Sequence, residues 1–312
     1  MNTSAVMHEI PAASQPLVSI GVPVRNGAAF LPEALALLGS QTYRHLEIII
    51  SDNGSTDGSQ EIISAFAASD SRVRVYRQSR TLTAFDNFRF VFEQSHGDYF
   101  MWAACDDRRS LDYVERLLDA MLCNPDAALA FGEVTETSDA QHWQSAKPAP
   151  YAFETAPSDS VKERLVRYTR INCLHIYGLL RSKSLRSYQW PDIDNGPDIP
   201  LLVHLAFMGE FVRANAACFY YYVPPTRKTM EERALVNSLH RLQRFPEVRL
   251  AWACARSAHQ AGQVSGRQVS KLGAFAIVYL NRHWRWLKPA IFERSPKCIV
   301  LAYRKWLKRA AG

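Results

Sequence analysis

The sequence lacks the features typical of membrane-spanning proteins, of secreted proteins and of proteins that bind a metal through cysteines. No apolar run in its 312 residues approaches the roughly 18 residues that a membrane-spanning helix needs. Residues 1–15 contain no basic start followed by an apolar stretch, so we expect a flexible N-terminus and no secretory leader. The six cysteines are scattered without metal-ligand spacing, which predicts ordinary core residues in a reducing compartment. We therefore expect a cytoplasmic protein.

Acidic residues are nearly absent from the C-terminal tail. Residues 281–312 hold nine Lys or Arg against the single acid Glu293, a net charge of +8, whereas the whole chain carries +7. Trp284 and Trp286 lie among these basic residues, and residues 297–309 are amphipathic if they are helical. Such a segment is typical of a peripheral helix on an anionic membrane surface. A helix packed on its own domain, with a solvated basic face, is the open alternative.

Nucleic acid is not an expected partner, because no recognition motif accompanies the basic tail. The composition, 47% hydrophobic and 21% charged, is that of an ordinary globular protein. We find no internal repeats. The length suits one large α/β domain, or a core domain with a helical appendage.

Strand-like and helix-like patterns alternate through residues 16–135, the predicted first half of the domain. Alternation of this kind predicts a doubly wound, mostly parallel sheet with right-handed crossovers. The expected strands are residues 17–24, 45–51, 73–77, 98–104 and 127–134, and the expected helices are residues 30–38, 59–68, 84–94 and 111–122.

The composition changes after residue 135. Residues 136–160 are rich in Ala, Pro, Ser and Thr, which predicts a flexible excursion. A second half of the same domain is expected over residues 136–230, and a basic helical extension over residues 231–312. The patterns predict helices at residues 161–171 and 199–208, and strands at residues 175–180 and 211–222.

A pair of carboxylates, Asp106 and Asp107, directly follows the apolar strand at residues 98–104. Ligands of open α/β sheets collect at the carboxyl ends of the strands. Adjacent carboxylates repel each other unless a cation or a proton lies between them, and a divalent metal that also holds substrate phosphates fits such a pair. The alternative is that one of the two aspartates caps a helix that begins near Ser110.

Two more polar loops follow strands of the same predicted sheet. Residues 23–27 (PVRNG) end the first strand, and residues 52–59 (DNGSTDGS) end the second. The second loop is also a good turn and helix-capping sequence without any ligand. Polar loops at three strand ends nevertheless indicate a shared ligand crevice.

The succession VSIGVPVRNG, HLEIIISDNGSTDGS and GDYFMWAACDDR resembles the nucleotide-sugar-dependent glycosyltransferases of family 2 over about residues 16–131. The resemblance implies an α/β GT-A fold, with a Rossmann-like, mostly parallel sheet and here a C-terminal helical extension. It also implies that Pro23, Val24, Asn26 and Asp52 grip the nucleoside.

The family's DxD element implies that a Mg²⁺ or Mn²⁺ ion binds the diphosphate. In this chain the element falls on residues 104–106, where Ala104 replaces the first acid, so Asp106 and Asp107 are the expected metal ligands and Asp106 also contacts the nucleotide sugar. Asn87 matches a loop position near the nucleotide, or it is an ordinary helix-surface residue. Arg25 replaces a common aromatic residue and either contacts the nucleotide or points to solvent.

The resemblance places the catalytic base of an inverting transfer at Asp198, at the start of a short helix. Asp192 and Asp194 are nearby competitors, and helix capping is the alternative role for Asp198. Arg227 or Lys228 would balance the charge of the leaving diphosphate, unless they are simply exposed loop residues. His175, Tyr177 and Trp190 either line an acceptor pocket or pack in the core.

The expected function is therefore inverting transfer of a sugar from a nucleoside diphosphate donor, most simply a UDP- or dTDP-sugar. The acceptor would be a glycan or a lipid-linked saccharide in bacterial surface polysaccharide assembly, such as capsule, lipopolysaccharide or exopolysaccharide. The alternative is a catalytically inactive nucleotide-sugar-binding adaptor at the membrane. A nucleotidyltransferase would need a Gly-rich basic loop after the first strand, which NGAAFLPEAL does not provide.

Overall fold

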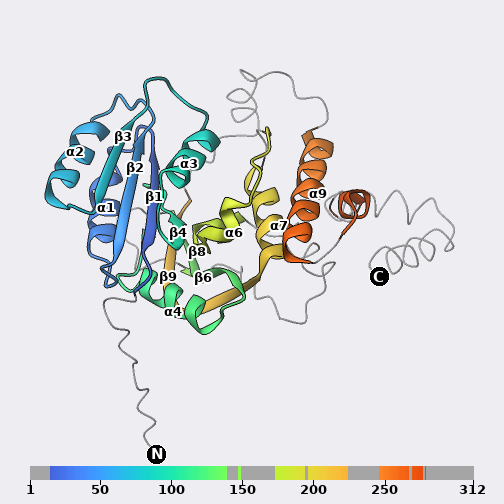
Figure 1. Cartoon of the computed structure of the whole chain (residues 1–312). Coiled ribbons are helices and arrows are strands. Elements are labelled where there is room, and N and C mark those ends of the chain that lie inside the picture. The colour runs from blue at the N-terminus through green and yellow to red at the C-terminus, as the bar shows by residue number, and fades with distance from the viewer. Residues whose placement is uncertain are drawn as a thin grey trace, which may run out of the picture.

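The computed structural model describes residues 15–138, 147–148, 173–193, 196–223, 246–266, 269–276 and 278 (Figure 1). The predicted helix at residues 161–171, the Arg227–Lys228 pair and the basic tail therefore lie outside the described residues.

One mixed sheet organises the described chain, in the order β3-β2-β1-β4-β8-β6-β9-β5, with β7 paired to β6. Strands β1 to β4 are parallel where they pair, as are β6 and β9, whereas β5, β7 and β8 run antiparallel to their partners. The predicted α/β class with a mostly parallel sheet is confirmed. The strands are β1 (Val18–Val24), β2 (Leu46–Asp52), β3 (Val73–Arg77), β4 (Tyr99–Trp102), β5 (Arg108–Arg109), β6 (Ala127–Thr137), β7 (Lys147–Pro148), β8 (Leu179–Arg181) and β9 (Glu210–Tyr222).

The helices cover both faces of the sheet, which explains why β1 is buried along its whole length. Helices α1, α2 and α4 pack into one apolar core, and α3, α7 and α9 pack into the other. At Gly21 of β1 a Cβ atom would lie 2.7 Å from side-chain atoms of Phe100 and Val91, so only glycine lets α3 approach this closely. The helices are α1 (Leu31–Gly39), α2 (Ser59–Ser69), α3 (Ala84–Glu93), α4 (Tyr113–Cys123), α6 (Ser182–Arg186), α7 (Asp198–Met208) and α9 (Pro246–Ser265).

One local prediction and one of the alternatives left open are wrong. The predicted strand at residues 175–180 is instead a 3-10 helix, η3 (Cys173–Tyr177), followed by the short strand β8. The helix after the carboxylate pair begins at Tyr113 with Asp112 at its N-cap, so neither Asp106 nor Asp107 caps it. The two-residue strand β5 intervenes and pairs with β9. Tertiary pairing decided both outcomes, which local sequence patterns do not encode.

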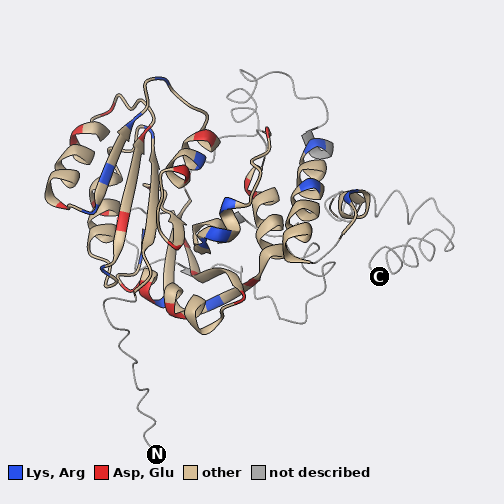
Figure 2. Cartoon of the chain, viewed as in Figure 1, with Lys and Arg blue, Asp and Glu red and all other residues tan. Residues whose placement is uncertain are grey.

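The second half of the chain completes the same sheet, since β8 and β9 pair with β4 and β6. Helix α9 packs against α7, whose sequence DIPLLVHLAFM has no charged residue after its first position (Figures 1 and 2). The domain boundaries near residues 135 and 230 remain predictions. None of the described helices is both long enough and apolar enough to cross a membrane.

The cysteines follow the sequence-based expectation only in part. Cys254 is buried, as expected of a core residue, whereas Cys123 is exposed on α4.

Candidate active site

The loops after β1 and β2 are hydrogen-bonded to each other. The backbone N–H of Asn26 donates to Ser55 Oγ at 2.9 Å, and Asn26 Oδ1 accepts from the N–H of Thr56 at the same distance. Asn26 adopts a left-handed backbone conformation with φ of 52°, which Asn tolerates better than most residues. The loop geometry therefore holds the predicted nucleoside residue Asn26 beside the DNGSTDGS segment.

The β1 loop also touches the carboxylate loop. At Gly27 a Cβ atom would lie 2.8 Å from Cys105 Sγ, so the two loops can approach only because residue 27 is glycine. Arg108 donates from Nη2 to Glu33 Oε2 at 2.7 Å and to the carbonyl of Phe30 at 3.4 Å. The structure thus brings the predicted loops together at one edge of the sheet.

Asp52 is buried at the end of β2. Its Oδ1 accepts from the N–H of Ser55 at 2.9 Å, which is the turn role expected of this sequence without a ligand. Its Oδ2 accepts no hydrogen bond from the described residues, although Arg77 Nη1 lies 3.5 Å away. One oxygen of Asp52 therefore retains capacity for a ligand donor.

The side chains of Pro23 and Val24 are buried, and these residues pair in register with Ser51 and Asp52. The Val24 carbonyl accepts from the N–H of Asn53 at 2.8 Å. These two residues therefore hold the first loop against the second, and any contact with a nucleoside would use their backbone. Arg25, by contrast, is exposed.

Asn87 lies on α3 and is buried, so the interpretation as a helix-surface residue is wrong. Its Oδ1 accepts from Ser51 Oγ at 2.6 Å, and its Nδ2 donates to the Ser51 carbonyl at 3.3 Å. The amide fastens α3 to the carboxyl end of β2. A direct contact with the nucleotide stays a prediction.

The two aspartates have different surroundings. Asp106 is half-buried, and burial raises its pKa, while Arg108 and Arg109 oppose the shift. Asp107 is only 2% exposed, and burial, followed by the charge of Asp106, raises its pKa to about 7. Asp107 Oδ1 accepts from the N–H of Tyr222 at 3.2 Å, and its Oδ2 has no hydrogen-bond partner among the described residues. Asp106 is therefore the more accessible ligand, and Asp107 also anchors the end of β9.

Two buried arginines, Arg108 and Arg109, directly follow this carboxylate pair, and no local pattern indicates their burial. Arg109 donates from Nη2 to the Trp102 carbonyl at 3.1 Å, and its guanidinium lies 5.1 Å from the ring centre of Phe219. Arg108 forms an ion pair with Glu33. Their positive charges favour the ionised carboxylates of Asp106 and Asp107.

An aromatic pocket of about 290 Å³ lies between α3, η3 and the start of α7. Asp198 supplies its carboxylate. Five aromatic side chains contribute to its wall: Phe85, Phe88, Trp102, Tyr177 and Trp190. Phe85 and Phe88 share one face of α3 because they are three residues apart, a spacing that could have predicted a common wall.

Tyr177 connects this pocket to the carboxylate loop. Burial and then the charges of Asp107 and Asp106 raise the pKa of Tyr177 well above its usual range. Trp102 also lines the pocket, and its carbonyl accepts from Nη2 of Arg109, two residues after Asp107, so the pocket adjoins the carboxylate loop.

Asp198 is the first residue of α7, as predicted, but it does not cap the helix. Pro197 occupies the N-cap position, and no side-chain capping hydrogen bond forms there. A negative charge in the first turn is favoured by the helix dipole. The competitor Asp192 is exposed and does not line the pocket, and Asp194 lies outside the described residues.

The predicted acceptor-pocket residues separate into two groups. Tyr177 and Trp190 line the pocket. His175 is buried, and its ring lies 4.7 Å from that of Phe131, so core packing accounts for it. Phe85, Phe88 and Trp102 were not predicted as site residues.

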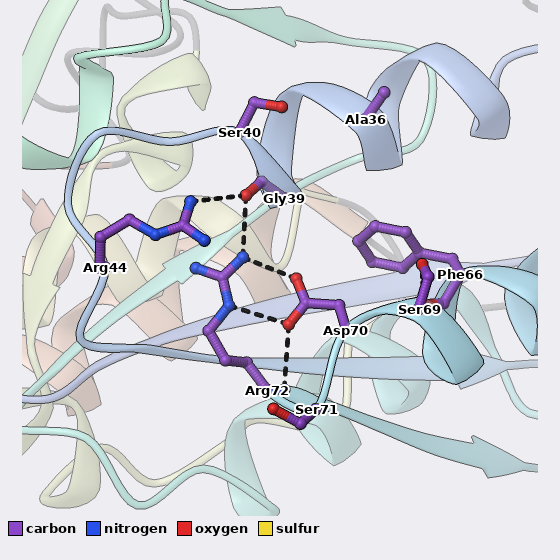
Figure 3. A pocket seen from close by; sticks show the side chains of 9 residues that line it. All are labelled: Ala36, Gly39, Ser40, Arg44, Phe66, Ser69, Asp70, Ser71 and Arg72. Atoms are coloured by element: carbon purple, nitrogen blue, oxygen red, sulfur yellow. Dashed lines mark hydrogen bonds and ion pairs between the residues drawn. The ribbon is translucent and has the colours of Figure 1, made fainter.

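A larger pocket, of about 590 Å³, lies away from this site, near the ends of α1 and α2 (Figure 3). Arg72 makes a two-point contact with Asp70, at 2.9 and 2.6 Å. Arg72 and Arg44 also donate to the Gly39 carbonyl, at 2.8 and 3.0 Å, at the C-terminal end of α1. These contacts satisfy a helix terminus. Because Arg72 directly precedes β3, the pocket lies at the amino ends of the parallel strands, whereas the carboxylate loop lies at their carboxyl ends.

The sheet, with polar loops meeting at its carboxyl edge, defines a GT-A fold of the nucleotide-diphospho-sugar transferase type. TarS from S. aureus, in complex with UDP-GlcNAc, superposes with a TM-score of 0.54 at 13% identity, over 86% of this chain and 91% of that one. The mannosyltransferase PcManGT from Pyrobaculum calidifontis, in complex with GDP-Man and Mn²⁺, gives a TM-score of 0.52 at 14% identity, over 95% and 84%. At these identities the likeness establishes the fold.

The chain belongs to glycosyl transferase family 2, whose model matches residues 19–188. A putative teichuronic acid biosynthesis glycosyltransferase, TuaG of Bacillus subtilis, is 25% identical over 67% of this chain and 79% of its own length. An uncharacterized glycosyltransferase of Haemophilus influenzae is 32% identical over 36% of this chain, and GlyG of Streptococcus pneumoniae is 36% identical over 32%. The matches span only 44% and 34% of those last two relatives.

Proposed function

We propose that the protein is an inverting glycosyltransferase that moves a sugar from a nucleoside diphosphate donor onto a saccharide or lipid-linked acceptor. The observation that carries the proposal is the continuity of the site. Trp102 lines the pocket that holds Asp198, and its carbonyl accepts at 3.1 Å from Arg109, which closely follows the Asp106–Asp107 pair. The proposed phosphate-binding carboxylates and the proposed base would thus lie in adjoining parts of a family 2 fold.

The donor would lie across the converging loops. Asp52 would accept from the base or the ribose through Oδ2, which forms an ion pair with Arg77 but accepts no hydrogen bond from the described residues. Asn26 would contact the nucleoside together with the backbone of Pro23 and Val24. Asn87 would hold the carboxyl end of β2 in place through its two hydrogen bonds with Ser51. The UDP, UDP-GlcNAc and GDP-Man complexes of the structural relatives support a nucleotide-sugar donor, and we propose a UDP- or dTDP-sugar.

The carboxylates suit a divalent cation. Mg²⁺ and similar hard ions commonly bind one or two carboxylates together with substrate phosphates. The half-buried Asp106 and the Asp107 Oδ2 fit that pattern, and no cluster of three or more potential ligands occurs among the described residues. When bound, Mg²⁺ or Mn²⁺ would neutralise charge on the leaving diphosphate.

Transfer would begin with the acceptor hydroxyl held in the pocket beside Asp198. The Asp198 carboxylate takes the proton as the acceptor oxygen attacks C1 of the donor sugar. The C1–O bond to the diphosphate breaks on the opposite side, and the nucleoside diphosphate leaves. The backbone N–H of Tyr222 donates to Asp107, and Arg227 follows Tyr222 by five residues. This short separation along the chain supports a role for Arg227 at the diphosphate.

Surface polysaccharide assembly is the proposed process, supported by the teichuronic acid relative. A nucleotide-sugar-binding adaptor without activity is the rival function, favoured only by Ala104 in place of the first DxD acid. The two functions differ in turnover, because an adaptor would bind the donor without hydrolysing or transferring it.

A thermal-shift screen tests donor binding. We expect one nucleotide sugar, with Mn²⁺, to raise the melting temperature of the full chain by several degrees. A ligand at about 100 times its Kd adds about 2.7 kcal/mol to the stability of the folded state. Mn²⁺ alone and the free sugar are the controls. If no UDP-, dTDP- or GDP-sugar shifts the melting temperature, the proposed function is wrong.

The basic tail yields a separate prediction about location. We propose that the protein lies peripherally on the inner face of the cytoplasmic membrane. Deletion of residues 296–312 removes five of the tail's nine cationic side chains, Lys297, Arg304, Lys305, Lys308 and Arg309. We expect the full chain to cosediment with vesicles containing anionic lipid and the deletion variant to stay in the supernatant. Equal cosedimentation of both would contradict the membrane role.

A further inference from the structure

Most of the described side chains that line the aromatic pocket are apolar or aromatic. Trp102 Nε1 already donates to the Phe88 carbonyl at 2.9 Å, so the indole N–H is not available to a ligand. Asp198 contributes the one carboxylate among the described lining residues. A hydroxyl pressed against these rings would lose its hydrogen bonds to water without gaining new ones. The pocket therefore favours a group with an apolar face.

The rings of the wall support one another. Trp190 meets Trp102 edge-on, with ring centres 6.4 Å apart and an interplanar angle of 90°, and meets Phe85 at 5.3 Å and 61°. Such edge-to-face packing is a preferred aromatic arrangement. Because the rings hold one another in place, the pocket presents a preformed surface to a ligand.

Size and position identify the occupant as one residue of the acceptor. The volume of about 290 Å³ is at the small end of ligand pockets, which suits one sugar ring better than a chain of isoprene units. Because the proposed base must lie within hydrogen-bond reach of the acceptor hydroxyl, the acceptor would lie beside Asp198.

We propose that this pocket is an acceptor subsite that selects a sugar residue bearing a methyl group, as 6-deoxy and N-acetylated hexoses do, over a fully hydroxylated hexose. The inference rests on the proposed function. The methyl group would lie against Trp190 and Phe85, while the attacking hydroxyl faces Asp198. Discrimination would arise because an added hydroxyl that lies against the ring faces of Trp190 and Phe85 gains no hydrogen bond from them.

The test compares methyl glycosides that differ at a single position. Methyl glucoside is assayed against its 6-deoxy analogue and, separately, its 2-acetamido analogue, and the pairs are repeated in the galacto and manno series. The donor is the nucleotide sugar identified by thermal shift. We expect kcat/KM for one class of methyl-bearing acceptor to exceed that of the parent hexoside by about tenfold to a hundredfold. The two arms distinguish the deoxy from the acetamido source of the methyl group.

Pocket variants tie the preference to this site. We expect Trp190→Ala to reduce the preference to about twofold or less while the donor-induced shift in melting temperature persists. Phe85→Leu, at a half-buried position, serves if Trp190→Ala does not fold. Trp252→Ala is the matched control, because Trp252 is an exposed tryptophan on α9 that does not line the pocket.

Several outcomes overturn the inference. The inference is wrong if the parent hexosides react as well as their methyl-bearing analogues in all three series. It is also wrong if Trp190→Ala leaves the preference unchanged. Loss of the donor-induced shift in Trp190→Ala would assign the pocket to the donor sugar, and competition by farnesyl phosphate alone would assign it to a lipid. If no donor binds, the proposed function fails. The same glycosides are then compared by quenching of tryptophan fluorescence, where equal affinities reject the subsite on its own.

Discussion

Replacement of Asp198 by Asn is expected to remove sugar transfer while leaving donor binding intact. The amide keeps the size of the carboxylate but cannot take the acceptor proton, and a positioned general base contributes about 10²–10⁴ in rate. We expect kcat to fall by about that factor. The donor-induced thermal shift should be unchanged, because Asp198 lies at the aromatic pocket and not at the converging nucleotide loops. Steady-state transfer assays and thermal shift with Mn²⁺ measure the two effects.

The matched control is Asp192→Asn, an exposed aspartate that precedes the same helix and does not line the pocket. Its variant should keep full transfer activity. Activity lost in Asp192→Asn and retained in Asp198→Asn would move the base to Asp192. Full activity in both variants would leave the proposed mechanism without its base.

Asp106→Asn is expected to abolish metal-dependent donor binding. Asp106 is the more accessible carboxylate of the pair, so the amide would replace the main ionic ligand of the cation. Loss of groups that only support a metal ligand already costs about 10–100-fold in metal affinity, and loss of the ligand itself should cost at least as much. Titration calorimetry of the donor, with Mn²⁺ and with EDTA, measures this. In the variant the two conditions should give the same weak affinity.

Asp119→Asn, an exposed aspartate on α4, is the control and should retain Mn²⁺-dependent binding. Asp107→Asn separates the two roles of the neighbouring carboxylate. If Asp107 holds the metal, this variant also loses the Mn²⁺ effect. If it only anchors Tyr222, it is less stable yet keeps that effect. Undiminished Mn²⁺-dependent affinity in both Asp106→Asn and Asp107→Asn would reject the metal site.

Local patterns predicted the first half of the fold well because strands and helices alternate along this part of the chain. The run VSIGVPV is apolar throughout, as a central parallel strand must be, and β1 is buried along its whole length. The convergence of the loops at Asn26, Asp52 and Asp106 followed from the same logic, since parallel strands present their carboxyl ends at one edge. Figure 1 shows these strands side by side.

Prediction was weaker where distant segments meet. Of the strand expected at residues 175–180, residues 175–177 belong to a 3-10 helix and residues 179–180 to the three-residue strand β8, which pairs with β4 and β6. Arg109 appears in the sequence as one more charge after the aspartates. Its burial depends on β5 pairing with β9, more than a hundred residues away. No local spacing encodes such a contact.

The family, the parallel sheet and the polar loops could be predicted from residue order alone, because hydrophobic periodicity and loop residues are local properties of the chain. Tertiary packing leaves Asp106 accessible while Asp107 is buried against Tyr222. It also decided that aromatic side chains from α3, β4 and η3, with Trp190 ahead of α7, form one pocket around Asp198. Burial and pocket shape arise from packing between distant segments, and packing is settled only when the whole domain closes on its core.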